Sequence, residues 1–339
     1  MTNLKSFTLN QLKELVKELG WEDYRATQIF TWIWQKGITD IDLMTNLAKP
    51  KRELLKEKYF ISQLKLAATQ KAKDGTQKFL FTLADNHNIE SVFIPEAGRK
   101  TVCVSTQVGC ALGCQICYTG KIGFKRNLRF FEIADQVLQV QKITGQKLTN
   151  VVFMGMGEPF LNFDECIIAV ETLNSDFGLN IGARKITIST VGITDKIYEY
   201  ARFPLQVKLA ISLNGADDKT RNYLMPITKK YPLNELIEAI RYYTKMKRKR
   251  VTFEYVLVKG VNDSIQDAAK LRKLIVAIPC KINLIPFNPF PGCELKSPDK
   301  TEVERFAEIL CPGLPAVTIR KSKGAEILAG CGQLSGKLS

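Results

Sequence analysis

The sequence contains almost no histidine, and this scarcity limits the chemistry open to it. Its 339 residues include a single histidine, His87, in the polar run Ala-Asp-Asn-His-Asn, a composition typical of a turn. Without a second histidine we expect neither a zinc hydrolase site nor a paired acid/base histidine mechanism. The chemistry is therefore expected to depend on thiols, carboxylates and cofactors.

Long apolar runs and a secretory signal are also missing. No apolar stretch approaches membrane-spanning length, and the chain does not start with a charged and then apolar segment. We therefore expect a cytoplasmic protein without membrane contact, whose thiols stay reduced, and not a disulfide framework. A hydrophobic content of 45% suits one large α/β domain with an accessory module.

Acidic residues are in deficit. Against 49 Lys and Arg there are 34 Asp and Glu, which gives a net charge of +15. This excess favours association with a polyanion, most commonly a nucleic acid. The alternative is a basic protein without such a partner, because net charge concerns association and not fold.

Three of the nine cysteines are closely spaced, in the run Gly-Cys110-Ala-Leu-Gly-Cys114-Gln-Ile-Cys117. Iron-sulfur clusters usually take four thiolates, so a tight triplet indicates a 4Fe-4S cluster with one iron free to bind another molecule, for which S-adenosylmethionine is the candidate. Zinc is the alternative. Structural zinc sites are four-coordinate and usually use two separated pairs, but a distant fourth cysteine could complete one.

The first 95 residues predict two accessory regions. Leucines recur at helical spacing over 8–19, and a second helix is expected over 25–36, where we assign Phe30, Trp32 and Trp34 to packing. Residues 61–95 predict a small β-hairpin with its turn at 85–88. The expected domains are thus a helical RNA-binding module at 1–60, a hairpin at 61–95 and the main domain at 96–339.

The main domain repeats strand and helix, which predicts an α/β fold with a parallel sheet curled into a partial (β/α)6 TIM-like barrel. Strands are expected over 101–105, 150–154, 185–189, 207–212, 251–257 and 281–286, with a last strand over 316–320. Helices are expected over 132–143, 164–173, 233–243 and 265–277.

Polar residues follow several of these strands. The cysteine triplet follows the first strand, Gly155–Pro159 the second and Ser189 ends the third, while Ser212 and Asn214 end the fourth and Asn288 follows the sixth. In barrel enzymes the active site is built at the carboxyl ends of the strands. Together these positions predict a site for a small zwitterion beside a cluster.

Four motifs now carry a family resemblance: Cys-x3-Cys-x2-Cys, Met-Gly-Met-Gly-Glu-Pro at 154–159, Leu-Ile-Pro-Phe-Asn-Pro at 284–289 and Ala-Gly-Cys-Gly-Gln-Leu at 329–334. The chain resembles, over nearly its whole length, the RlmN group of radical S-adenosylmethionine RNA methyltransferases. The resemblance implies methylation of carbon-2 of adenine in large-subunit ribosomal RNA and in tRNA. It also implies an electron donor such as flavodoxin or ferredoxin, and a monomer.

By this resemblance two thiols outside the cluster take part in catalysis. Carbon-2 of adenine is electron-poor and cannot attack a methyl group as a nucleophile, so the family uses a radical route with two S-adenosylmethionine molecules per turnover. Cys331 accepts a methyl group from the first, and the second is reductively cleaved to a 5′-deoxyadenosyl radical that takes hydrogen from the methylated sulfur. The carbon radical adds to the base, and Cys103 then joins Cys331 in a disulfide.

The same resemblance assigns Glu90 as proton acceptor and Cys110, Cys114 and Cys117 as cluster ligands. Read without it, Glu90 is an exposed strand carboxylate, Cys103 a buried core cysteine and Cys331 an incidental thiol. The cofactor contacts carried over are Gly157, Glu158, Ser189, Ser212, Leu213, Asn214 and Asn288.

The chain departs from the family pattern at two positions. Ile116 stands where many radical enzymes have an aromatic residue, with Tyr118 nearby, and Asn214 stands where the family commonly has histidine. Asparagine still supplies a donor and an acceptor, but it cannot titrate.

Three basic segments are expected to contact RNA, and they lie at 121–129, 245–250 and 321–323; the first is favoured because it follows the cysteine loop. Two alternatives remain for the function. One is a sibling enzyme that methylates carbon-8 of adenine and confers antibiotic resistance. The other is a zinc-stabilised RNA-binding protein without catalysis.

Overall fold

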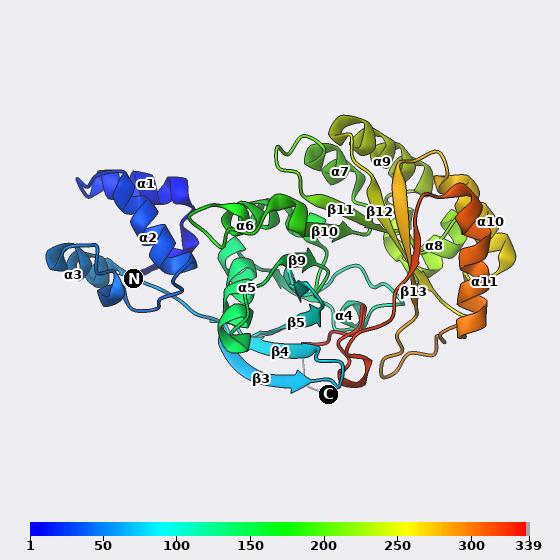
Figure 1. Cartoon of the computed structure of the whole chain (residues 1–339), viewed down its shortest axis with the longest axis horizontal. Coiled ribbons are helices and arrows are strands. Elements are labelled where there is room, and N and C mark those ends of the chain that lie inside the picture. The colour runs from blue at the N-terminus through cyan, green and yellow to red at the C-terminus, as the bar shows by residue number, and fades with distance from the viewer. Residues whose placement is uncertain (337–339) are drawn as a thin grey trace.

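A ten-stranded sheet organises the computed structural model, which describes residues 1–336 (Figure 1). Its order is β14-β13-β12-β11-β10-β9-β6-β5-β4-β3, and all pairs from β6 to β14 are parallel. The parallel strands are β6 (Arg99–Cys103), β9 (Asn150–Phe153), β10 (Ile186–Thr190), β11 (Lys208–Ser212), β12 (Val251–Leu257), β13 (Cys280–Pro286) and β14 (Val317–Ile319). This confirms the predicted partial barrel.

Helices connect these strands and cover the outside of the sheet (Figure 1). They are α5 (Phe130–Thr144), α6 (Phe163–Asn174), α7 (Thr194–Tyr200), α8 (Asp218–Leu224), α9 (Leu233–Lys247), α10 (Ile265–Ile275) and α11 (Lys300–Leu310). The short helix α4 (Tyr118–Lys121) lies in the cysteine loop. A separate antiparallel pair, β7 (Gln107–Gly109) and β8 (Phe124–Asn127), follows β6.

Alternation along each strand sends side chains into two environments. In β11, Leu209 and Ile211 are buried in the core, whereas Lys208 and Ser212 line cavities inside the barrel. One strand thus contributes an apolar face to the helices and a polar face to the interior. The interior face positions the functional groups described below.

Residues 61–95 extend the same sheet. β3 (Lys65–Lys71), β4 (Gln77–Thr82) and β5 (Asn88–Glu96) are antiparallel, and β5 pairs with β6. The predicted hairpin is β4–β5, with Asn86 in the left-handed region in its turn. Because Phe79, Leu80 and Phe81 are all buried, β4 is covered on both faces. The proposed domain boundaries remain predictions.

The amino-terminal helices α1 (Leu9–Glu18), α2 (Tyr24–Trp34) and α3 (Lys49–Lys58) lie at one end of the molecule (Figure 1). Phe30 and Trp34 are buried as expected, and Trp32 is half-buried. A buried ion pair links this region to α5, since Lys5 Nζ lies 2.6 Å from Asp135 Oδ1. Burial lowers the pKa of Lys5, and Asp135 opposes that shift.

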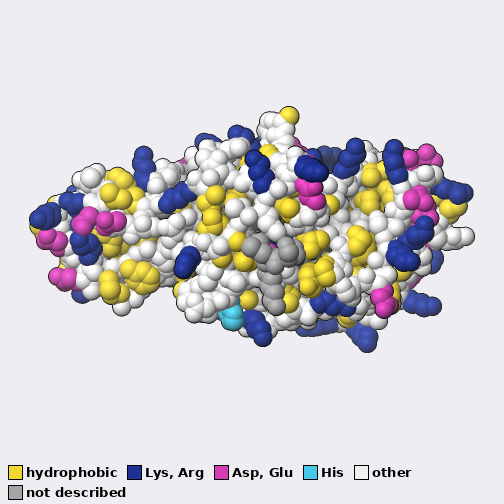
Figure 2. Space-filling view, turned by 90° about the horizontal axis from the view of Figure 1, so that it is seen from below, with side chains coloured by type: hydrophobic (Ala, Val, Ile, Leu, Met, Phe, Trp, Pro, Cys, Tyr) yellow, Lys and Arg dark blue, Asp and Glu magenta, His cyan; other side chains and the backbone are white. Residues whose placement is uncertain are grey.

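Basic side chains are spread along the length of the molecule on the face shown in Figure 2. The net charge is therefore not gathered into one patch on that face. Within the described residues, no helix combines the length and apolar character needed to cross a bilayer.

Candidate active site

The three clustered cysteines lie in the loop between β7 and β8, and their side chains line one cavity. The loop begins at Gly109, whose φ of 74° places it in the left-handed region. A Cβ there would lie 1.7 Å from the carbonyl oxygen of Gly123. That oxygen accepts a hydrogen bond from Cys110 N at 3.0 Å. Only glycine therefore lets the loop close this tightly.

The cavity disfavours free thiolates. Burial raises the pKa of Cys110 to about 12 and that of Cys114 well above its usual value, with repulsion between the thiols adding to both shifts. Bound metal offsets this penalty because it stabilises the deprotonated sulfur. Among the described residues no three His, Cys, Asp or Glu side chains converge on a single ion. Three thiols that line a shared cavity fit a 4Fe-4S cluster, which is usually held by cysteine thiolates.

Gly157 and Glu158 lie beside this loop at the end of β9, as predicted. Gly157 has φ 98°, and a Cβ there would lie 2.5 Å from the Cβ of Gln107, so the backbones can approach only at glycine. The Glu158 carboxylate accepts hydrogen bonds from Phe160 N and Val191 N, both at 2.9 Å. Burial raises the pKa of Glu158 to about 7. This side chain therefore also ties the β9 loop to the end of β10.

The other predicted cofactor contacts fall into two groups. Ser189, Ser212 and Asn214 line the cysteine cavity. Asn214 is buried there, with Oδ1 accepting from Val256 N at 2.8 Å. Leu213 is buried and its side chain lines neither cavity.

Asn288 lies apart from the cysteine cavity. It lines a second cavity, and its Nδ2 donates to the carbonyl oxygen of Cys331 at 3.1 Å. The structure thus places Asn288 against the Cys331 loop.

Cys103 and Cys331 come together inside the barrel. Both line the second cavity, and Cys331 also lines the cysteine cavity. Both thiols are free. Burial raises the pKa of Cys103 to about 12, and the nearby Cys331 adds to the shift. The Cys331 side chain is exposed, but the surrounding protein still desolvates it and raises its pKa, while Arg320 opposes that shift.

The Cys331 loop packs directly on the cysteine loop. Gly332 O accepts a hydrogen bond from Tyr118 N at 2.6 Å, and a Cβ on Gly332 would lie 2.6 Å from Ile116 O. Ile116 is buried and lines the cavity at the position where an aromatic residue was expected. Tyr118 stacks on Phe290 instead, with ring centroids 5.2 Å apart.

Glu90 is not the exposed carboxylate that its sequence context predicts. Its side chain is fully buried on β5, with Oε1 at 3.1 Å from Lys78 Nζ. Its Oε2 accepts hydrogen bonds from the backbone nitrogens of Ser335 at 2.7 Å and Gly336 at 3.0 Å. It lines neither cavity, so in this structure it holds the segment that follows Cys331.

Sequence reasoning missed Glu254. It is buried on β12 and lines both cavities. Its Oε1 accepts from Asn283 Nδ2 at 2.8 Å, whereas Oε2 makes no hydrogen bond and lies 3.9 Å from Arg320 Nη1. A carboxylate in the middle of the otherwise apolar strand Val-Thr-Phe-Glu-Tyr-Val-Leu was the available signal.

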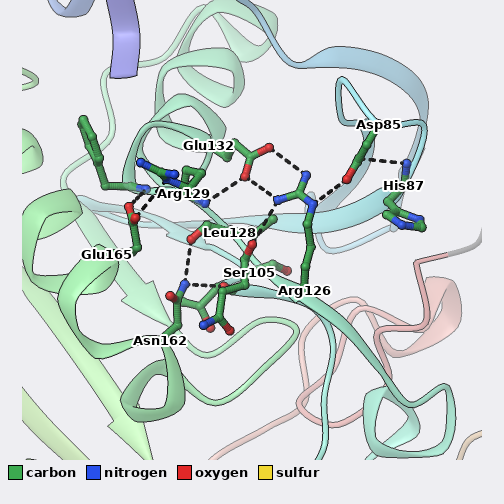
Figure 3. A network of polar contacts seen from close by, with 12 residues as sticks. Asp85, His87, Ser105, Arg126, Leu128, Arg129, Glu132, Asn162 and Glu165 are labelled. Carbon is green, nitrogen blue, oxygen red and sulfur yellow. Dashed lines mark hydrogen bonds and ion pairs between the residues drawn. The ribbon is translucent and has the colours of Figure 1, made fainter. Parts of the chain in front are cut away.

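The basic segment after the cysteine loop is largely committed to structural contacts (Figure 3). Arg126 forms a bidentate ion pair with Glu132, at 2.8 and 2.9 Å, and a second pair with Asp85. Arg129 Nε lies 2.9 Å from Glu165 Oε1. The segment favoured as the RNA contact therefore retains few uncommitted cations.

This fold, with a three-cysteine loop at the carboxyl end of a partial barrel, defines a radical S-adenosylmethionine enzyme. The family model of the Radical SAM superfamily matches residues 104–272, and that of the "Ribosomal RNA large subunit methyltransferase N-terminal domain" matches 2–61. The chain belongs to the RlmN family of RNA methyltransferases. The zinc-stabilised, non-catalytic alternative is therefore wrong.

Individual relatives agree. The dual-specificity RNA methyltransferase RlmN of Desulfosudis oleivorans is 48% identical over 92% of this chain and 85% of its own length. The dual-specificity RNA methyltransferase RlmN of Geobacter sulfurreducens is 44% identical over 100% of this chain and 93% of its own length. The crystal structure of a radical SAM methyltransferase from Sphaerobacter thermophilus superposes with a TM-score of 0.94, at 42% identity over 99% of this chain and 100% of that one.

Proposed function

We propose that this enzyme methylates carbon-2 of adenosine in both 23S ribosomal RNA and tRNA. One observation carries the proposal: Cys331 lines both the cavity of the cluster cysteines and the cavity that contains Cys103. A methyl group on this sulfur would face the cofactor on one side and a substrate base on the other. The printed names of the relatives, dual-specificity RNA methyltransferases, support the two substrate classes.

In this proposal the cysteines and Glu90 have separate roles in the reaction. Cys110, Cys114 and Cys117 would hold the 4Fe-4S cluster, which supplies the electron that cleaves S-adenosylmethionine. Cys331 would carry the methyl group, and Cys103 would form the disulfide that releases the product. Glu90 would keep the role of proton acceptor only if the segment that it binds moves aside, because the carboxylate is sealed from both cavities.

The cofactor contacts remain part of the proposal. Gly157, Ser189, Ser212 and Asn214 border the cysteine cavity, where their backbone and polar groups can bind the amino and carboxylate ends of S-adenosylmethionine. Glu158 would take the ammonium group with its remaining lone pairs. Leu213 would contribute through its backbone and Asn288 through the Cys331 loop.

Further parts of the proposal concern the reaction's partners. We propose that the enzyme uses two S-adenosylmethionine molecules per turnover and receives its electron from a flavodoxin or ferredoxin. We also propose that it is a monomer and works in the cytoplasm. Reaction of one S-adenosylmethionine in methyl transfer and of a second in radical formation would release S-adenosylhomocysteine and 5′-deoxyadenosine in equal amounts.

The test is mass analysis of nucleosides from tRNA and ribosomal RNA treated with the reconstituted enzyme. We expect 2-methyladenosine in both RNAs. The Cys331→Ala variant should keep its cluster and make no methylated base. Methylation at carbon-8 alone would favour the sibling activity, and undiminished turnover by the variant would refute the role of Cys331.

A further inference from the structure

The barrel interior has a second opening, at the amino ends of the strands. The cavity there measures about 560 Å³ and extends from Cys103 and Cys331 to the first residues of several strands. It shares Met154, Glu254, Ile285 and Cys331 with the cysteine cavity. The two cavities therefore meet at Cys331 and lead to opposite ends of the barrel.

Four cations surround this second opening, and we call them the cationic ring: Arg99, Lys208, Arg250 and Lys281. Arg99 begins β6 and Lys208 begins β11, while Arg250 precedes β12 and Lys281 is the second residue of β13. Arg99, Lys208 and Lys281 line the cavity directly. Lys321 and Lys323, from the third predicted RNA segment, line it as well.

The cationic ring meets little opposing charge within the described residues: Glu254 attracts Lys281, whereas Arg250 and Arg99 repel it. Among residues 1–336 none of its four members forms an ion pair, and Arg99 Nε donates only to Thr101 Oγ1. The carboxylates lining the cavity are Glu96 and Glu254. Burial lowers the pKa of Lys208, and repulsion from Lys281 and Arg99 lowers it further.

Like charges held together without partners disfavour the folded chain, and a bound polyanion removes that repulsion. The carboxyl end of the barrel has less free space and fewer unpaired cations for binding RNA. Its cavity must hold the cluster and S-adenosylmethionine, and Arg126 and Arg129 beside it are paired with carboxylates. The target adenine must also leave its stack to reach a thiol inside the barrel.

We propose that the RNA backbone docks on the cationic ring and that the target nucleotide enters the barrel from the amino ends of the strands. The base then meets Cys331 from the side opposite the cysteine loop. This inference rests on the proposed function, because it takes RNA as the substrate and Cys331 as the methyl carrier. It replaces the segment at 121–129 as the principal phosphate contact.

Binding of a tRNA transcript, followed by fluorescence anisotropy at several salt concentrations, tests the inference. We expect Lys208→Gln with Lys281→Gln to weaken binding about tenfold and to reduce the slope of log K against log salt by about 1.4 to 1.8, the loss of two phosphate contacts. The matched control is Lys273→Gln with Arg305→Gln, since both residues are exposed on the outer helices α10 and α11. That control should bind as the parent does.

Two outcomes would overturn the inference: equal affinity and slope in the ring variant and the control, or a larger loss in Lys121→Gln with Lys125→Gln on the cysteine side. Arg250→Gln, an exposed single change, gives the same comparison if the double variant is unstable. The affinity measurement uses the enzyme without S-adenosylmethionine. It therefore stands whether the methyl group is later found on carbon-2, on carbon-8 or on neither.

Discussion

The two ends of the barrel interior treat charge in opposite ways. At the carboxyl end the charged side chains have fixed partners: Glu158 accepts from two backbone amides, and buried Arg221 donates to Thr228 Oγ1 and to two carbonyl oxygens. At the amino end, by contrast, no member of the cationic ring forms an ion pair within residues 1–336, although Glu96 and Glu254 line the same cavity. A preorganised site suits a small cofactor of fixed shape, whereas cations without ion-pair partners suit a long polyanion.

The largest effect is expected from a substitution in the cysteine loop, at the carboxyl end of the barrel. We expect Cys110→Ala to abolish iron binding and all methylation, because two thiolates cannot hold the cluster. Iron and sulfide analysis, with nucleoside mass analysis, measures this. Cys311→Ala, at an exposed cysteine, is the control and should retain both. Full iron content in Cys110→Ala would remove this residue from the ligand set.

The contact between the Cys331 loop and the cysteine loop is the next test. In Gly332→Ala the added Cβ would lie 2.6 Å from Ile116 O, on a residue with φ 82°, so the loop must shift. A misplacement of this size is expected to slow methylation about 100-fold. Gly20→Ala is the matched control, because Gly20 also has a positive φ, 69°, but an added Cβ there would meet nothing within 4 Å.

Initial rates of 2-methyladenosine formation separate these two variants. Both should lose similar thermal stability from backbone strain, which melting curves report. Equal rates in the two would show that the packing of the Cys331 loop does not position the thiol.

The next prediction concerns stability and uses Glu90, a buried residue that lines neither cavity. Glu90→Gln leaves the Lys78 ammonium buried without its counter-charge. Removing one partner of a buried ion pair costs about 3–5 kcal/mol. Urea unfolding should show this loss, and the double variant Lys78→Met with Glu90→Gln should recover most of it. If the double variant remains as unstable as the single one, the pair does not account for the effect.

The smallest effect is a pH dependence at Glu254, where the two cavities meet. Burial raises the pKa of Glu254, while Arg320 and Lys281 act against the shift. A raised native pKa means that the native state holds the proton more tightly than the unfolded state. Its contribution to stability is therefore complete below the unfolded pKa and is lost as pH rises through the native value.

Unfolding free energies of the parent and Glu254→Gln across this pH range measure the effect. The amide keeps an oxygen for Asn283 Nδ2 but does not titrate. We expect the parent's advantage over the variant to fall as pH rises. A constant difference would show that Glu254 does not titrate differently in the native state.

The strand pattern was readable because each buried parallel strand is a short apolar run between turn signals. The expected strand over 251–257 coincides with β12, and the expected helix over 265–277 differs from α10 only at its end. The sequence also predicted which residues meet at one cavity: the cysteine triplet, Gly157, Glu158, Ser189 and Ser212 all line it. Their positions at strand ends were enough for that prediction, because parallel strands bring their carboxyl ends to one edge of the sheet.

Residues whose environment depends on distant segments could not be read in this way. Glu90 is buried on a strand in the middle of the sheet, and it contacts Lys78 and residues 335–336, up to 246 positions away. Asn288 lies against Cys331 and not in the cysteine cavity, because its side chain bonds to a residue 43 positions along the chain. Arg126 was expected to be available to RNA, but Glu132 and Asp85 hold it.

The sequence by itself determined the repeating strand and helix and the cysteine loop, since these depend on local periodicity and on donor atoms at short spacing. Only the tertiary structure decided that Cys331 stands between two cavities and that the cations at 99, 208, 250 and 281 form one ring. These residues are far apart in the chain. Closing the sheet into a barrel brings them together, because alternate side chains of every strand point to the same interior.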